Sequence, residues 1–344
     1  MPASNVRPPP PSTLPLGMQP YHIIFFLHFT IIVLFGTFYS ILTGSHHTNL
    51  HTTLARSSTP SAPLSGDFTA HANLPPVAEV AGYWADRKNL VNQLFVKRAW
   101  FWTTLAWAVQ CFVLRTHNGA VTEAEAKHAK REGQPQKGEA QGSGPVARSV
   151  LRWTVATGCW LLFTSWFFGP PLAERILTAT GGICIPSPGV SGSIDASYCR
   201  TRSTITSTTH PALFSQLSLT PAGVPITALR PLWRGGHDIS GHTFLMVLSG
   251  LYLLEEIAVF LPHLLPEPLK AWFPRRGWSS ENPFVDTNGD IKWKQVAALA
   301  ASVAVVALWS WMLLMTAVYF HTPLEKFTGL GVAFACWAVL PKGG

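Results

Sequence analysis

The sequence predicts an all-α, polytopic integral membrane protein with six transmembrane helices. Hydrophobic residues make up 47% of the 344 residues and charged residues only 12%, whereas charged residues account for about a quarter of an average soluble domain. The chain also contains 14 Trp and 20 Phe, and aromatic side chains gather at membrane interfaces. Several apolar stretches are long enough to cross a hydrocarbon core of roughly 30 Å. These observations favour a membrane bundle over a soluble domain.

The predicted elements follow from where the apolar stretches begin and end. Residues 1–20 are rich in Pro and Ser, with Arg7 as their only charge, so we expect a disordered cytoplasmic tail. Residues 21–344 are expected to form a single membrane domain. Its first apolar stretch is too long for a typical signal peptide and lacks a strongly basic segment before it, which indicates an uncleaved helix. The predicted spans are residues 23–42, 97–115, 153–172, 242–265, 296–320 and 324–340.

Basic residues set the predicted sidedness of the bundle. Two loops, residues 116–152 and 266–295, carry clustered Lys and Arg, and such loops remain in the cytoplasm. Alternation of the spans then places both termini in the cytoplasm and the turn at His321 on the opposite face. We interpret the net charge of +8 as this topology signal, because the basic residues lie in short patches beside apolar segments. No nucleic-acid partner is expected.

The densest polar cluster lies just before the fourth predicted span. Residues 235–242 read Gly-Gly-His-Asp-Ile-Ser-Gly-His and lead directly into an apolar stretch. The glycines permit tight turns, and Asp238 or Ser240 can cap the new helix. The unpaired N–H groups of the first helical turn favour an anion such as phosphate. His242 and His321 share a predicted membrane face, so the sequence places two imidazoles on the same side.

These motifs resemble known enzymes of lipid metabolism. Ser240-Gly241-His242 before one span, with His321 after a later one, resembles the paired histidines of lipid phosphate phosphatases. A closer resemblance, over about residues 83–339, is to the fat storage-inducing transmembrane (FIT) family. It rests on four segments in consistent order: residues 88–102, residues 238–245 (Asp-Ile-Ser-Gly-His-Thr-Phe-Leu), the Glu255-Glu256 pair, and residues 316–321 (Thr-Ala-Val-Tyr-Phe-His).

The FIT resemblance implies a multi-pass protein of the endoplasmic-reticulum membrane with a lumenal active site. The implied activity is that of a fatty acyl-CoA diphosphatase, which cleaves acyl-CoA to acyl 4′-phosphopantetheine and adenosine 3′,5′-bisphosphate. This activity supports lipid droplet biogenesis, phospholipid biosynthesis and lipid homeostasis of the reticulum. The implied partners are fatty acyl-CoA and membrane lipids, including diacylglycerol and triacylglycerol. Carried over by motif, His242 is the expected general acid and His321 the nucleophile, roles that imidazole can fill near pH 7.

The chain departs from the wider phosphatase pattern beside His321. That pattern has an Arg shortly before its second histidine, whereas residues 312–320 contain none, and it has an Asp four residues after it, where this chain has Glu325. The positive charge that neutralises phosphate must therefore come from elsewhere. The candidate cations are Arg87, Lys88, Lys97 and Arg234. The substrate-binding residues that we predict are Asp238, Ser240, Arg234 and Lys88.

Other polar residues have simpler interpretations. His237 and His242 could begin a metal site, but no Cys or carboxylate cluster completes it, so neither a metal nor a cofactor is expected. Glu255 and Glu256 follow His242 by thirteen and fourteen residues, which is roughly 20 Å along a helix. They cannot share its site, and we expect them to have a structural role.

Two questions stay open in the sequence. Cys184 and Cys199 lie in one polar loop and can pair if that loop faces an oxidising lumen. The function also has alternatives. The chief one is a non-catalytic protein that binds diacylglycerol or triacylglycerol and promotes droplet budding. Two others are a transporter that uses the Glu pair as a proton site, and a phosphatase that acts on phosphatidic acid.

Overall fold

The computed structural model describes residues 18–45, 82–86, 89–115, 145–165, 169–186, 192–215, 228–270, 273, 282–286 and 288–342. Lys88 and Arg87, two of the candidate cations, lie outside these residues. So do most of the predicted tail and most of the predicted loop 116–152.

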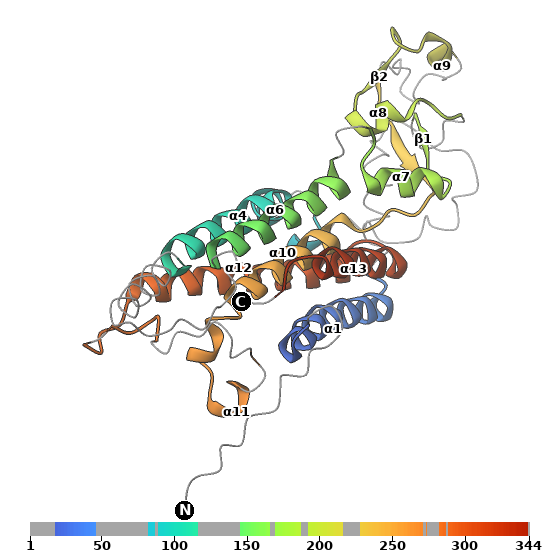
Figure 1. Cartoon of the computed structure of the whole chain (residues 1–344). Helices are drawn as coiled ribbons and strands as arrows, with labels where there is room; N and C mark the ends of the chain where they lie inside the picture. The colour runs from blue at the N-terminus through green and yellow to red at the C-terminus, as the bar shows by residue number, and fades with distance from the viewer. Residues whose placement is uncertain are drawn as a thin grey trace, which may run out of the picture.

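The described chain is mostly helical, as predicted, and its long helices run side by side (Figure 1). Each predicted span overlaps one of them. Two of the described helices, α1 with 24 residues and α12 with 27, are long and apolar enough by themselves to cross a membrane. The number of spans therefore stays a prediction. The long helices are α1 (Pro20–Thr43), α4 (Ala99–Gln110) with a π-helical end η6 (Cys111–Arg115), α6 (Pro145–Thr164), α10 (Gly241–Ile257), α12 (Trp293–Tyr319) and α13 (Pro323–Ala338).

The shorter elements connect these helices or form a small cap at one end of the bundle. The connecting turns are η4 (Tyr83–Ala85), α3 (Leu90–Leu94), η5 (Val96–Arg98), η7 (Leu261–His263) and α11 (Glu267–Lys270). The cap consists of α7 (Leu172–Ala179), β1 (Ile183–Ile185), α8 (Ala196–Thr201), β2 (Ile205–Thr206), α9 (Pro211–Ser215), β3 (Ala228–Leu229) and β4 (Leu232–Arg234).

Helix α10 is the centre of the bundle. It contacts α1, α4, α6, α12 and α13, and its apolar side chains between Phe244 and Ile257 are mostly buried. A Cβ added at Gly250 would lie 2.3 Å from the Phe29 ring, so this glycine allows α1 to approach closely. On the other side, Phe163 of α6 stacks on Phe244 with ring centroids 4.0 Å apart. The helix is apolar all round because it is covered on every side.

A buried polar network closes the end of the bundle far from His242. Glu255 Oε2 lies 2.8 Å from His22 Nε2, and Arg152 Nη1 lies 3.4 Å from Glu255 Oε1. Arg152 Nε also forms an ion pair of 2.9 Å with Glu256 Oε1, while Ser149 Oγ donates a hydrogen bond of 2.6 Å to Glu256 Oε2. All five side chains are buried. The network therefore joins α1, α6 and α10, which is the structural role expected for the Glu pair.

This network also explains where α6 begins. The third span is predicted at residues 153–172, but α6 starts at Pro145 and ends at Thr164. Its first two turns include Ser149 and Arg152, which hydropathy places in a loop. They can enter the bundle because Glu255 and Glu256 satisfy their polar groups, and buried charges require such partners.

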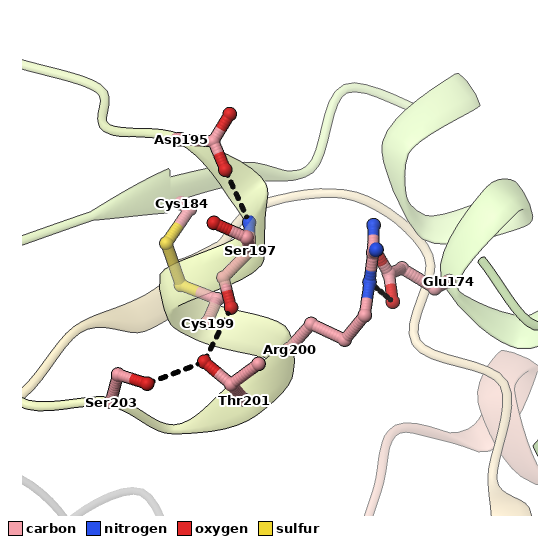
Figure 2. Close-up of a disulfide and its surroundings, with 8 residues drawn as sticks. All are labelled: Glu174, Cys184, Asp195, Ser197, Cys199, Arg200, Thr201 and Ser203. Atoms are coloured by element: carbon pink, nitrogen blue, oxygen red, sulfur yellow. Dashed lines mark hydrogen bonds and ion pairs between the residues drawn. A yellow bond between two sulfur atoms is a disulfide. The ribbon is translucent and has the colours of Figure 1, made fainter. Parts of the chain in front are cut away.

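The cap is fastened by short antiparallel strands and a disulfide. Strand β1 pairs with β4, and β2 with β3. Cys184 of β1 and Cys199 of α8 form a disulfide with their Cα atoms 5.9 Å apart, which answers the question that the sequence left open (Figure 2). Disulfides persist in oxidising compartments. An oxidising setting is the condition under which the sequence allowed these two cysteines to pair.

Polar contacts around the disulfide tie its helix to the rest of the cap (Figure 2). The guanidinium of Arg200 donates to both carboxylate oxygens of Glu174, with Nη2 2.7 Å from Oε1. Asp195 caps α8 by accepting a hydrogen bond from the Ser197 backbone N–H. Hydrogen bonds from Ser197 lower the pKa of the Asp195 carboxyl, so this cap contact persists at mildly acidic pH.

We expect Arg152→Met to destabilise the bundle strongly. The substitution leaves two buried carboxylates without their guanidinium, and removing one member of a buried ion pair costs about 3–5 kcal/mol. Thermal unfolding of the purified protein in detergent measures the loss. Lys294→Met, at an exposed position of α12, is the matched control and should leave the midpoint unchanged. Adding Glu255→Gln to Arg152→Met should restore part of the stability; no restoration would mean that the carboxylates are not ionised together.

Candidate functional site

The predicted junction forms a sharply turned loop that ends at the N-terminus of α10. Gly235 and Gly236 have φ of 73° and 74°, which is the left-handed region that glycine adopts without strain. A Cβ at Gly236 would also lie 2.4 Å from the Leu177 carbonyl oxygen of α7. Ser240 then caps α10, because its Oγ accepts a hydrogen bond of 3.2 Å from Thr243 N. Of the two residues that the sequence offered as the cap, Asp238 and Ser240, the structure has Ser240.

His237 fixes this loop to two neighbouring elements. Its backbone N–H donates a hydrogen bond of 2.7 Å to Thr180 Oγ1, at the end of α7. Its ring Nε2 lies 2.9 Å from Thr328 Oγ1 of α13. His237 therefore holds the loop in place, whereas His242, the second residue of α10, is partly exposed at the helix end. Asp238 and Arg234, in the loop before α10, are exposed.

His321 lies in the tight turn between α12 and α13. Its φ is 59°, a left-handed conformation that is uncommon for residues other than glycine. Its Nδ1 lies 3.4 Å from Glu325 Oε2, and each side chain is 17% exposed. Glu325 is itself held, because the same oxygen accepts a hydrogen bond of 2.8 Å from Thr322 N in a capping box. A carboxylate at Nδ1 orients the imidazole and leaves Nε2 directed away from it.

The two histidine-bearing segments meet directly through their backbones. Ser240 N donates a hydrogen bond of 3.1 Å to the Glu325 carbonyl oxygen. Next to this bond, a Cβ added at Gly329 would lie 2.7 Å from the Ser240 carbonyl oxygen. His242 follows Ser240 by two residues, and His321 precedes Glu325 by four. The structure therefore brings together the N-termini of α10 and α13, each with one of the predicted histidines beside the contact.

The structure has one buried cation in this region, Lys326, that was not identified from the sequence. Lys326 is 1% exposed, and its Nζ donates a hydrogen bond of 2.5 Å to the Ala317 carbonyl oxygen near the end of α12. It joins α12 to α13 beside Glu325. Its position inside a predicted apolar span was the signal that the sequence offered, since a charge there needs a partner.

An open cavity of about 400 Å³ lies between α4, α6 and α10. It reaches α10 at Leu245, three residues after His242 and therefore on the same side of the helix. Of the two cations that line it, Lys97 was named from the sequence as a candidate phosphate ligand, after Arg234 and Lys88, whereas Arg98 was not named. Its lining residues are Lys97, Arg98, Trp100, Phe101, Thr104, Trp160 and Leu245.

A metal ion in this region would require a set of grouped ligand side chains. Within the residues that the structure describes, no three His, Cys, Asp or Glu side chains are grouped as a metal site requires. The arrangement instead offers imidazole groups, a carboxylate that orients one of them and the N–H groups of two helix N-termini. These groups suit proton transfer and attack at a phosphate.

Comparison with known proteins agrees with the FIT resemblance. The family described as "Fat storage-inducing transmembrane protein" matches residues 80–340. "Acyl-coenzyme A diphosphatase fit1" of Schizosaccharomyces pombe is 26% identical, over 76% of this chain and 73% of its own length. "Acyl-coenzyme A diphosphatase SCS3" of Saccharomyces cerevisiae is 23% identical, over 72% of this chain and 86% of its own. "Acyl-coenzyme A diphosphatase FITM2" of Xenopus tropicalis is 26% identical, over 75% and 70%. No solved structure matches the chain.

We expect Gly329→Ala to disturb the contact between the two histidine-bearing segments. The new methyl group would lie 2.7 Å from a backbone oxygen that cannot rotate away, so α13 must shift from α10 at a cost of about 1–3 kcal/mol. Gly331→Ala is the matched control, because a Cβ there meets nothing within 4 Å. Thermal unfolding in detergent compares them. An equal midpoint for both variants would contradict the close packing of α13 on Ser240.

Proposed function

The chain belongs to the fat storage-inducing transmembrane protein family, and we propose that it acts as a fatty acyl-CoA diphosphatase, a hydrolase of acid anhydrides. The main support is the backbone contact between Ser240 and Glu325, which joins the two histidine-bearing segments. The names of the relatives from Schizosaccharomyces pombe, Saccharomyces cerevisiae and Xenopus tropicalis support the same activity. The proposed products are acyl 4′-phosphopantetheine and adenosine 3′,5′-bisphosphate.

In the proposed reaction, His321 attacks phosphorus through Nε2. Glu325 holds Nδ1 and stabilises the positive charge that develops on the ring. The P–O bond of the anhydride breaks as the P–N bond forms, and His242 gives its proton to the departing phosphate oxygen. Water then cleaves the P–N bond and returns both histidines to their first state. Two imidazoles suit these steps because both protonation states are accessible near neutral pH.

The N-terminus of α10 contributes to phosphate binding in this proposal. The N-terminus of this helix carries the partial positive charge of the helix dipole, which attracts anions. Ser240 holds the first turn in shape, and exposed Arg234 and Asp238 lie in the loop that leads to it. Arg234 adds positive charge, and Asp238 is a candidate to orient His242. Lys88 keeps its predicted role as a further phosphate ligand.

The membrane character of the family and the apolar helices α1 and α12 support a membrane location. We propose six spans in the endoplasmic-reticulum membrane, both termini in the cytoplasm and the site in the lumen. The disulfide in the cap supports that sidedness, because the cap bonds to the His237 loop through Thr180. Removal of acyl-CoA at this surface would support lipid droplet biogenesis and membrane lipid homeostasis, with diacylglycerol and triacylglycerol as neighbouring lipids.

We expect His242→Ala and His321→Ala each to lower acyl-CoA hydrolysis by at least about 10²-fold, the range of effects for a positioned acid or base. The assay adds acyl-CoA to purified protein in detergent and follows release of adenosine 3′,5′-bisphosphate. His210→Ala, in the cap beside Tyr198, is the control and should keep full activity. Full activity of either His242→Ala or His321→Ala would contradict the proposed catalytic roles of the two histidines.

The same two variants separate hydrolysis from lipid binding. In the alternative function, the protein binds diacylglycerol or triacylglycerol without catalysis. A folded His321→Ala protein that restores droplet budding in cells lacking the wild-type protein would favour binding, whereas failure to restore it would favour hydrolysis.

We expect Glu325→Gln to lower kcat by about 10- to 100-fold, the usual effect of removing a group that orients a functional imidazole. Glutamine can still complete the capping box, so the thermal midpoint should stay close to that of the wild-type protein. The KM for acyl-CoA should change little, because Glu325 contacts the histidine and not the substrate. If the thermal midpoint falls far enough to account for the lost activity, Glu325 acts only as a helix cap.

A further inference from the structure

The cavity beside α10 has apolar walls and a cationic rim. Trp100 and Trp160 stack with ring centroids 5.9 Å apart and planes 11° from parallel, and Leu245 adds an aliphatic surface. Phe101 is 59% exposed on the side of the bundle. These side chains offer a surface that fits a hydrocarbon chain.

Two polar groups of the cavity walls have partners on α6. Trp100 Nε1 donates a hydrogen bond of 3.2 Å to Thr157 Oγ1. Thr104 Oγ1 accepts one of 3.2 Å from Trp153 Nε1. A hydrocarbon chain can therefore lie against Trp100 and Thr104 without breaking these two hydrogen bonds.

The rim of the cavity carries two adjacent exposed cations, Lys97 and Arg98. Lys97 Nζ donates a hydrogen bond of 2.7 Å to Gln93 Oε1, a neutral acceptor, and among the described residues no carboxylate forms an ion pair with it. The pair stands at the start of α4, where the proposed topology places the lumenal membrane surface. Cations at the polar end of an apolar groove match a ligand with an anionic group and an alkyl chain.

The position of Leu245 links the cavity to the proposed reaction site. Leu245 follows His242 by three residues, which is about 4.5 Å along the axis and on the same side of the helix. A ligand whose phosphate lies at the N-terminus of α10 therefore has the cavity on its membrane side.

We propose that this cavity binds the acyl arm of the substrate, with the alkyl chain against Trp100, Trp160 and Leu245 and an anionic phosphate near Lys97 and Arg98. This inference rests on the proposed diphosphatase function and adds the residues that select for a long acyl chain. It also adds Lys97 and Arg98 to Arg234 and Lys88 and assigns them to the phosphate on the acyl side.

The first experiment measures chain-length selectivity, the ratio of kcat/KM for palmitoyl-CoA to kcat/KM for butyryl-CoA. Leu245→Trp fills the cavity and should lower this ratio at least 10-fold, with butyryl-CoA cleaved at nearly the wild-type rate. Leu105→Trp, at an exposed position of α4 that does not line the cavity, is the control and should leave the ratio unchanged. An unchanged ratio in Leu245→Trp, or equal losses with both substrates, overturns the proposal.

The second experiment tests the cations. The double variant Lys97→Gln with Arg98→Gln should raise KM about 10-fold for both substrates and leave kcat nearly unchanged, since charge-assisted hydrogen bonds to the phosphate are lost. Lys294→Gln, at the exposed start of α12, is the control and should keep the wild-type KM. An unchanged KM in the double variant overturns the role of the cations.

Photocrosslinking separates this proposal from the diphosphatase assignment. A fatty acyl-CoA with a diazirine on its acyl chain is bound to the His242→Ala protein, and labelled peptides are identified by mass spectrometry. Labelling within residues 97–104 and at Trp160, competed by palmitoyl-CoA, supports the cavity even where no hydrolysis is detected. Labelling confined to other helices overturns the proposal, while a wild-type protein that cleaves no acyl-CoA overturns only the diphosphatase assignment.

Discussion

The buried charge network at one end of α10 constrains the rest of the bundle. Glu255 and Glu256 have no access to water, so each must keep its partners, and those partners come from α1 and α6. Apolar helices in lipid gain little specificity from hydrophobic contact alone, because lipid tails are as apolar as leucine. Charged groups with fixed geometry supply that specificity. They set which faces of α1 and α6 meet α10, and thereby the space that remains between α6, α10 and α4.

The opposite end of α10 is fixed by backbone contacts instead of charges. There the Ser240 N–H bonds to the Glu325 carbonyl oxygen, and Gly329 allows the backbones to approach. The loop before this turn bonds to the cap through His237 and Thr180, and the positive end of the helix dipole lies there. The central helix thus has one end closed by buried ion pairs, whereas Gly241 and His242 at its other end are partly exposed. The chemistry proposed above, which needs both water and phosphate, is therefore assigned to that end.

Sequence patterns predicted the long helices and the placement of His242 and His321 at helix ends, but not the contacts that hold these helices together. The polar cluster and the apolar stretch after it were enough to predict a capped helix and to limit the cap to Asp238 or Ser240, because capping is local. The beginning of α6 was placed too late by hydropathy, since the burial of Arg152 depends on carboxylates about a hundred residues further along the chain. Lys326 and the cavity at Lys97 and Arg98 depend on how helices pack, which no local pattern records. The joint role of His242 and His321 stays a prediction.

An acyl-CoA has a polar nucleotide part that prefers water and an acyl chain that prefers lipid, and in the proposed function the bundle binds each part in a different place. The nucleotide and anhydride need water and positive potential, which a helix N-terminus at the membrane surface offers. Moving the acyl chain from lipid into water costs about 0.8 kcal/mol of free energy for each methylene group. A site that lifted the whole substrate out of the bilayer would therefore bind it poorly. The cavity proposed for the acyl chain is lined by Leu245 of α10 and by the cations Lys97 and Arg98. In this proposal the chain stays in an apolar setting while the anhydride lies at the N-terminus of α10. The direction of α10 would then set both the orientation of the substrate and the face on which it is cleaved.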